Sequence, residues 1–363
     1  CRSLLRSIEM EKEIPVSEGI SLVSRTQQKE EFMARHPKTP PGALAAAALF
    51  LFMGVLNGCA FLAREATRVY MTINAQFSDK DIEFQINKSF IEKYKDRVSI
   101  TTTFTVDQAM QKPTARIFDG DLHMAGRAPE IGLSAVAEIA NGASAKKAVD
   151  LVHSVEGTGR PLQISGVWRI WAEHGGSAEQ EQGTPLPAAT SNNPGHIFEI
   201  HPITRINTIR LLDTFRPVEG YLPGGARDCF DSYEKAECTI TVKPKTVSIV
   251  VRKGLWNDVQ FLMEIAADRQ IEVPGGRFVI ASARDMKGDL LVKRLRMVFA
   301  KDTPPEKAVR LLKRGARLHV YGLPRMDFSQ LSRRVRGSKK EPALLVRPLP
   351  YEIIIQGVYT DDK

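Results

Sequence analysis

The sequence lacks the short motifs and long apolar runs by which many proteins can be classified. It contains no His-Glu-x-x-His or other compact metal-ligand motif, so no metalloprotease-type site is indicated. Its main apolar run, residues 43–56, is shorter than the roughly 20 residues that a membrane-spanning helix needs. Only four cysteines are present, which limits the number of disulfide bonds. Function has to be inferred from patterns spread along the chain.

The composition is that of a globular protein with a basic character. A chain of 363 residues with 43% hydrophobic residues can form two or three domains with ordinary cores. The formal net charge of +9 favours acidic partners, such as nucleic acid, anionic lipid headgroups or anionic polysaccharide. The net charge indicates an acidic partner but does not distinguish between nucleic acid, lipid and polysaccharide.

Residues 33–58 resemble a bacterial lipoprotein signal peptide. A positive start at Arg35 and Lys38 precedes the apolar run, and Leu56-Asn57-Gly58-Cys59 is similar to a lipobox, where signal peptidase cuts before a diacylated cysteine. The resemblance implies that Cys59 is the lipid-bearing N-terminus of the mature protein, tethered to a membrane. An uncleaved anchor and a buried helix are the alternatives.

The residue after Cys59 bears on location. Ala60 stands where lipoproteins retained at the inner membrane usually have aspartate, so the resemblance implies attachment to the outer membrane, facing the periplasm. Secretion argues against genomic DNA as a partner and leaves an anionic polymer or an envelope protein. Residues 1–32 are interpreted as a non-native upstream leader. The mature chain would then begin with a tether over 59–96 that includes a helix over 62–71.

Two cysteines remain for a disulfide bond once Cys1 and Cys59 are set aside. Cys229 and Cys238 would lie in an oxidising compartment, where a bond between them is permitted. A helix predicted over 226–237 would hold their Cα atoms roughly 13 Å apart, which exceeds disulfide reach. The bond forms only if the helix ends early and the chain doubles back, so both states stay open.

One sequence pattern occurs twice in the chain. Residues 147–151, 159–169 and 198–200 recur in the same order as residues 307–311, 315–325 and 351–353. A repeat of this length is one small fold used twice, in contrast to a solenoid of short units. We therefore predict a first domain over 97–206, a connector over 207–240 and a second domain over 241–363.

Both copies predict the same succession of elements: several strands, one helix, then two strands separated by a long connection. Ser144 is predicted to cap the first helix, which continues through Val152, and the second helix has a capping-box start at Thr303-Pro304-Pro305-Glu306. A helix between the third and fourth strands is the arrangement of the OB-fold, a five-stranded Greek-key barrel. The predicted fold is mainly β with α: two tandem OB-fold-like five-stranded barrels, each with one inserted helix.

Two strand limits are also predicted. The strand that starts at His196 is expected to end before Pro202, because proline lacks a backbone donor. The second domain is expected to include a strand over 246–251, which is rich in β-branched residues.

Histidines distinguish the two copies. Five of the seven lie in the first copy, at positions 123, 153, 174, 196 and 201, and only His319 lies in the second. Alignment of the copies places Ile354 opposite His201, Leu349 opposite His196 and Leu291 near His123. A feature that differs between duplicates is a better candidate for function than a shared one. Glu199 is matched by Glu352, which favours a structural hydrogen bond or ion pair for Glu199.

Four residues of the first copy could bind a metal. Glu199 and His201 share one face of a strand, where they could bind one ion or form a base and its orienting partner. Asp121 and His123 have the same spacing in an earlier strand and could supply further ligands. A divalent metal is therefore the candidate cofactor. Histidines bonded to the backbone are the alternative.

An aromatic strand and a basic segment are the candidate ligand-binding features. Trp168, Arg169 and Trp171 lie on one strand, where a surface tryptophan beside an arginine would form a stacking platform for sugars or bases. Alternatively, both indoles fill the barrel or its interface with the other copy. In the second copy, the loop between the last two strands carries Arg333, Arg334 and Arg336, which could meet phosphates. A solvated loop or one lying on an anionic membrane explains this cluster equally well, and it has no interleaved aromatic residues.

Parts of the first copy resemble a pattern found in uncharacterised bacterial proteins with a small OB-like barrel. The matching segments are Asp119-Gly120-Asp121-Leu122-His123, Glu138-Ile139, residues 162–168 and Phe198-Glu199-Ile200-His201-Pro202-Ile203. Staphylococcal-nuclease-like barrels have a related plan, but their arginine and carboxylate set cannot be placed on this chain. The resemblance implies the fold and a special role for His123, Glu199 and His201, and it supplies no reaction.

Three hypotheses of function follow from these patterns. The first is a non-enzymatic, envelope-anchored lipoprotein that binds an anionic polymer or a protein partner. The second is a metal-dependent hydrolase, such as a phosphodiesterase, that uses His123, Glu199 and His201. The third is a structural envelope scaffold, in which the histidines and both tryptophans are packed.

Overall fold

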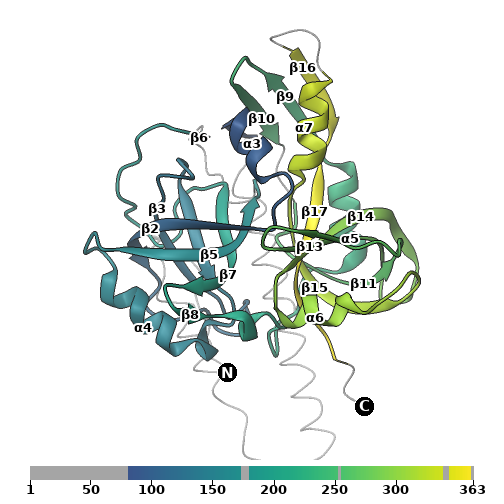
Figure 1. Cartoon of the computed structure of the whole chain (residues 1–363), viewed down its shortest axis with the longest axis horizontal. Helices are drawn as coiled ribbons and strands as arrows, with labels where there is room; N and C mark the ends of the chain where they lie inside the picture. Colours follow the sequence, from purple (N-terminus) through teal and green to yellow (C-terminus); the bar gives the residue numbers. More distant parts are fainter. Residues whose placement is uncertain (1–80, 173–179, 252–254, 338–342, 361–363) are drawn as a thin grey trace, which may run out of the picture. The chain divides into compact units, whose positions relative to one another are not determined.

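The computed structural model describes residues 81–172, 180–251, 255–337 and 343–360 (Figure 1). The predicted leader, signal peptide, lipid-bearing Cys59 and helix over 62–71 lie outside these residues, and so does His174. Within the described ranges, no helix is both long and apolar enough to cross a membrane.

The first barrel consists of five strands: β2 (Ser99–Ala109), β3 (Leu122–Arg127), β4 (Ala135–Ile139), β5 (Pro161–Ile170) and β7 (Phe198–Ile206). Pairing runs in the order β4-β3-β2-β5-β7, and a β4–β7 pairing closes the ring. That closing pair is parallel, and the other pairs are antiparallel. Helix α4 (Lys146–Val155) lies between the third and fourth strands in the chain, and the short β8 (Ile209–Arg210) pairs with the end of β7.

The second barrel has the same plan. Its strands are β11 (Val259–Ile265), β13 (Gly276–Arg284), β14 (Leu290–Ala300), β15 (Arg317–Met326) and β17 (Tyr351–Val358), with β12 (Ile271–Val273) at the edge of β13. The ring closes through β11–β13, and β14–β17 is again the parallel pair. Helix α6 (Pro304–Arg310) lies between the third and fourth strands. The predicted pair of OB-fold-like five-stranded barrels, each with a helix between its third and fourth strands, is confirmed.

A third sheet combines strands from distant parts of the chain. In order of pairing, it contains β16 (Ala343–Pro348), β9 (Glu237–Val242), β10 (Thr246–Val251), β1 (Ile82–Asn87) and β6 (Gln180–Glu181). Helices α3 (Lys88–Tyr94), α5 (Ala226–Lys235) and α7 (Phe328–Arg336) flank these strands in the sequence, and α3 contacts α7. Strand 246–251 therefore belongs to this sheet and not to the second barrel, whose first strand is β11.

Pro202 does not end its strand, contrary to the prediction. β7 continues through it to Ile206. The ladder with β5 is irregular at this point: Gly166 pairs with Ile203 and Trp168 with Ile200, so His201 and Pro202 together oppose Val167. A proline is tolerated at such a bulge because no ladder hydrogen bond is needed from its nitrogen.

The two inserted helices begin differently. α4 starts at Lys146 without a side-chain cap, and Ser144 instead donates to the Asn141 carbonyl at 2.8 Å, so the predicted cap at Ser144 is wrong. At α6, the Thr303 hydroxyl accepts a hydrogen bond from the Glu306 N–H, as the capping pattern predicts.

The barrels contact each other through equivalent residues. Arg169 of the first barrel donates to the Pro324 carbonyl at 2.7 Å, and Arg325 of the second donates to the Trp168 carbonyl at 2.8 Å. Arg169 also donates to the carbonyl of Asn257 and Arg325 to that of Arg97, and each acceptor lies two residues before the first strand of its barrel. The contact is thus reciprocal, like the isologous interface of a symmetric dimer.

Candidate metal centre

Acidic and imidazole side chains gather on the outer face of the first barrel. Along β3, β4 and β7, Leu122, Ala137 and Ile200 belong to the apolar core, and successive strand residues point to opposite faces. The alternate positions hold His123, Glu138, Glu199 and His201. The register brings His123 directly opposite Glu138, and β4 and β7 run side by side. Strand alternation and barrel closure therefore place all four on one face.

His201 lies at the middle of the cluster and is only 4% exposed. Its Nε2 is 3.0 Å from Asp121 Oδ2. Its Nδ1 is 3.3 Å from Glu138 Oε2 and 3.5 Å from Glu199 Oε2. One imidazole ring thus touches three carboxylates from three different segments.

Two further histidines flank these carboxylates. His123 Nε2 lies 3.1 Å from Glu138 Oε2, and His196 Nε2 lies 3.5 Å from Glu199 Oε1. The other ring nitrogen of His196, Nδ1, is 2.7 Å from the Pro194 carbonyl, which orients the ring.

Arg169 completes the cluster on its far side. Its Nη1 donates to Glu199 Oε2 at 2.7 Å, and the two residues are directly paired across β5 and β7. Arg325 and Glu352 make the same contact in the second barrel, also at 2.7 Å. The structural ion pair predicted for Glu199 from its match to Glu352 is confirmed.

The connector after the first barrel covers part of this face. Asn141 donates its backbone N–H to Asp121 Oδ1 at 2.9 Å and its side-chain amide to the carbonyls of Thr214 and Arg216. Val218 packs close to Gly120, which has a positive φ of 76°. The connector thereby holds the turn that carries Asp121 and limits solvent access to it.

Burial and ion pairing shift the pKa values in opposite directions. Burial raises the pKa of Asp121, and burial together with the nearby Asp121 raises the pKa of Asp119 to about 7. Burial alone would raise the pKa of Glu138, but His123 and His201 outweigh it and bring that pKa to about 2. Burial alone would lower the pKa of His123, but Glu138 raises it to about 9. Burial alone would likewise lower the pKa of His201, but Glu138 and Asp121 raise it. At neutral pH, protons on His123 and His201 therefore balance carboxylates of the cluster, and a metal ion bound there would have to displace them.

The geometry fits a metal ion. Asp121, Glu138 and His201 form one group of side chains whose ligand atoms lie within 4.8 Å of one another, and Glu138, His196 and Glu199 form another. Imidazole nitrogen and carboxylate oxygen are the ligands of zinc and of several other divalent transition metals. These buried groups could therefore hold a metal ion.

All four residues predicted as metal ligands lie in this cluster: Asp121, His123, Glu199 and His201. Sequence reasoning did not assign Glu138 or His196 to it. Glu138 had two signals, because it belongs to the matching segment Glu138-Ile139 and is a charged residue in an otherwise apolar strand, Ala135–Ile139. His196 precedes β7, and its approach to Glu199 depends on a backbone turn that local periodicity does not encode.

The second barrel has apolar residues where the first has this cluster. The strand registers place Phe278 at the position of His123, Val298 at that of Glu138 and Ile354 at that of His201. All three belong to an apolar cluster that also contains Val167 of the first barrel. The alignment of His123 with Leu291 is wrong, because Leu291 lies on the third strand of its barrel and His123 on the second.

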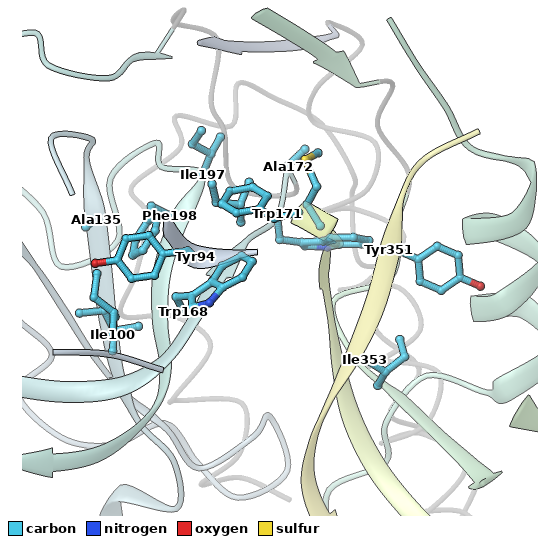
Figure 2. Packing of buried hydrophobic residues seen from close by; sticks show 14 of the residues in the cluster. Tyr94, Ile100, Ala135, Trp168, Trp171, Ala172, Ile197, Phe198, Tyr351 and Ile353 are labelled. Atoms are coloured by element: carbon cyan, nitrogen blue, oxygen red, sulfur yellow. The ribbon is translucent and has the colours of Figure 1, made fainter. Parts of the chain in front are cut away.

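The predicted stacking platform is not formed. Trp168, Arg169 and Trp171 are 0%, 0% and 3% exposed, respectively. Trp168 stacks on Phe328 with ring centroids 4.6 Å apart, and its indole N–H donates to the Arg97 carbonyl. Figure 2 shows both indoles within a packed group of apolar side chains. The alternative, that both tryptophans fill the core and the interface between the copies, is confirmed.

The basic segment of the second copy is a helix and not a loop. Asp327 caps α7 by accepting from the Gln330 N–H, and Phe328 and Leu331 bury its other face. Arg333 and Arg336 are exposed, whereas Arg334 is half-buried and donates to the Pro348 carbonyl at 2.5 Å.

The candidate disulfide bond is absent. Cys229 and Cys238 are both buried and free. α5 ends at Lys235, so the predicted helix is shorter than expected, yet Cys238 then enters β9 and contacts the Pro348 carbonyl, while Cys229 contacts that of Asp258. Burial raises the pKa of the Cys238 thiol to about 11, so it is protonated at neutral pH.

No known protein-family model and no curated protein matches this chain. The assignment of function therefore rests on the geometry of the described residues.

Proposed function

We propose that this protein is a metal-binding protein whose first barrel holds a divalent cation. The observation that carries this proposal is the convergence of His201, Asp121 and Glu138 within coordination reach of one ion. The three residues come from different segments, so an ion would join β4, β7 and the turn before β3.

Burial of the centre favours a structural role for the ion. Glu138, Glu199 and His201 are at most 5% exposed, so a substrate could reach them only if the segments that cover them moved. The hydrolase that uses His123, Glu199 and His201 is the alternative and requires such a movement. A buried structural ion binds only the folded chain and raises its stability accordingly.

Metal removal tests this proposal. Purified protein treated with a chelator and dialysed is expected to melt at a lower temperature than the same protein reloaded with Zn²⁺. At free Zn²⁺ about 100-fold above the Kd, the expected stabilisation is about 2.7 kcal/mol. His201→Gln should abolish the Zn²⁺ effect, and His153→Gln, which changes a histidine on α4, should retain it. Equal melting temperatures with and without Zn²⁺, and no stoichiometric metal by elemental analysis, would contradict the proposal.

A second candidate function is the binding of an anionic polymer through α7. Arg333 and Arg336 project from its last turn, and the exposed Arg347 follows on β16. We call these three residues the α7 surface. The Arg336 side chain is 60% exposed and has one carboxylate nearby, Glu92 at 3.6 Å. Such a surface can bind phosphate or sulfate groups through electrostatic attraction alone.

Salt-dependent binding tests the α7 surface. The double variant Arg333→Ala/Arg336→Ala is expected to bind single-stranded RNA more weakly. Its plot of log K against log salt should be less steep by about 1.4, because each lost contact removes about 0.7. Arg334 is left unchanged because of its bond to Pro348. The control Lys307→Ala/Lys313→Ala removes two exposed charges near α6 and should bind as the wild type does. Equal binding by both double variants, with RNA and with heparin, would remove this candidate.

For location, we propose a membrane anchor at Cys59 on the periplasmic side of the outer membrane. The lipobox-like Leu56-Asn57-Gly58-Cys59 supports this proposal. Cys59→Ala is expected to prevent incorporation of labelled palmitate and to move the protein out of the membrane fraction. Labelling that persists in the variant would count against the anchor.

A further inference from the structure

Glu138 belongs to both groups of candidate metal ligands. One group pairs it with Asp121 and His201, and the other pairs it with His196 and Glu199. We propose that the centre holds two cations bridged by the Glu138 carboxylate. This inference rests on the proposed metal binding and specifies its stoichiometry and ligands.

The position of Glu138 suits a bridge. Two imidazoles lie close to one of its oxygens: Oε2 is 3.1 Å from His123 Nε2 and 3.3 Å from His201 Nδ1. A carboxylate has two oxygens and about four lone-pair sites, and can therefore bind one cation through each oxygen. Two ions held in this way lie about 3.5–4 Å apart in known two-metal sites.

His201 supplies a second, independent sign of a ligand. Its Nδ1 is buried and makes no hydrogen bond, although Glu138 Oε2 lies 3.3 Å and Glu199 Oε2 3.5 Å away. Its Nε2 meanwhile contacts Asp121. A buried ring nitrogen between two carboxylates is a position where a cation can replace a proton.

Glu199 is arranged to serve the second cation. Arg169 binds its Oε2 at 2.7 Å, while Oε1 faces His196 Nε2 at 3.5 Å. The arginine thus fixes the carboxylate and leaves the other oxygen directed toward His196 and the shared Glu138. Backbone contact from Pro194 orients His196 toward the same point.

The ligand chemistry selects the class of metal. Three imidazoles and three carboxylates surround the centre, namely His123, His196, His201, Asp121, Glu138 and Glu199. Mixed nitrogen and oxygen ligands suit Zn²⁺ or Mn²⁺ better than Ca²⁺ or Mg²⁺, which prefer oxygen alone. Two divalent cations and the Arg169 guanidinium carry five positive charges against three negative charges from the carboxylates, and Asp119, half-buried beside Asp121, can supply a fourth negative charge.

The stoichiometry of Zn²⁺ binding tests the bridge. Chelator-treated full-length protein is dialysed against Zn²⁺, and bound zinc is measured by elemental analysis. The wild type is expected to bind two ions per chain, and Asp121→Asn and His196→Gln one each. The control His153→Gln should still bind two. One ion in the wild type would overturn the bridged pair and leave the proposed metal binding intact, and no bound ion would overturn both.

Electron paramagnetic resonance of the wild type loaded with Mn²⁺ provides a test that needs no variant. Two ions bridged by Glu138 are expected to give an exchange-coupled spectrum at two equivalents of Mn²⁺. A spectrum of isolated Mn²⁺ ions at that loading would overturn the bridge even if two ions bind.

Discussion

Arg325 shows how strongly a single buried charge depends on its partners. The residue is fully buried, its Nε lies 2.7 Å from Glu352 Oε1, and its other donors reach the carbonyls of Trp168 and Val98. Burial lowers its pKa to about 10 despite the nearby Glu352. All of its contacts lie inside the protein, so its loss leaves Glu352 Oε1 and several carbonyls without their donor, while Arg296 still binds Glu352 Oε2.

We expect Arg325→Met to destabilise the protein by about 1–3 kcal/mol, because Glu352 Oε1 and buried carbonyls lose their donor while Arg296 still balances the Glu352 charge. The measurement is urea unfolding followed by fluorescence. Arg294→Met changes an exposed arginine on the neighbouring β14 and should cost less than about 0.5 kcal/mol. A loss below about 1 kcal/mol for Arg325→Met would show that the pair is not a stabilising contact.

For single residues, prediction from the sequence succeeded where the spacing between neighbouring residues was enough to place a side chain. Glu199 and His201 occupy one face because strand residues alternate, and this is a local property. It failed for Trp168, whose burial depends on Phe328 and on the second barrel, more than 150 positions further along the chain. An exposed and a buried tryptophan have the same local pattern.

At the scale of single elements, α6 illustrates a cap that serves two purposes. The Thr303 hydroxyl accepts a hydrogen bond from the Glu306 backbone N–H, as in a capping box. The Glu306 carboxylate instead accepts hydrogen bonds from Arg277 at 2.7 Å and from Arg310 at 2.6 Å. The helix start is thereby joined to β13. Burial alone would raise the pKa of Glu306, but Arg310 and Arg277 outweigh it and lower that pKa.

This shift predicts a pH dependence. A carboxyl whose pKa is lower in the folded state stabilises the protein above its unfolded pKa, and the stabilisation is lost as pH falls through the folded value. From the unfolded value of 4.5 downward, the wild type should therefore lose stability more steeply than Glu306→Gln. The control Glu272→Gln removes another partner of Arg277 that is 80% exposed, and should keep the wild-type slope. Parallel acid unfolding curves for all three proteins would contradict the assignment.

Elements whose partners lie nearby in the repeat were predicted well, and the third sheet was not. β10 has the pattern of a strand, but nothing local states that it pairs with β1, which precedes the first barrel. A run of β-branched residues predicts a strand but does not identify the strand with which it pairs.

For the whole molecule, the reciprocal arginine contacts join the two barrels. An apolar cluster with Val98 and Val167 of the first barrel and Phe278 and Val298 of the second lies between them. Phe215 and Tyr221 of the connector join the same cluster. Neither barrel can therefore lose its structure without exposing apolar surface and buried carbonyls of the other.

We expect a single thermal transition in the chelator-treated protein, with the calorimetric enthalpy equal to the van't Hoff enthalpy. Val298→Ala, which truncates a side chain in the cluster between the barrels, should lower the midpoint while the transition stays single. Two resolved transitions in scanning calorimetry would show that the barrels unfold independently.

The sequence by itself determined the repeat, the order of elements and the candidate histidines, because each can be recognised from the spacing of nearby residues or from a comparison of the two copies. Only the tertiary structure decided that Glu138 joins His201, that the tryptophans are buried and that the basic segment is a helix beside a third sheet. The physical reason is that barrel closure and strand pairing bring distant residues together, and the free energy of those contacts depends on partners that a local pattern does not identify.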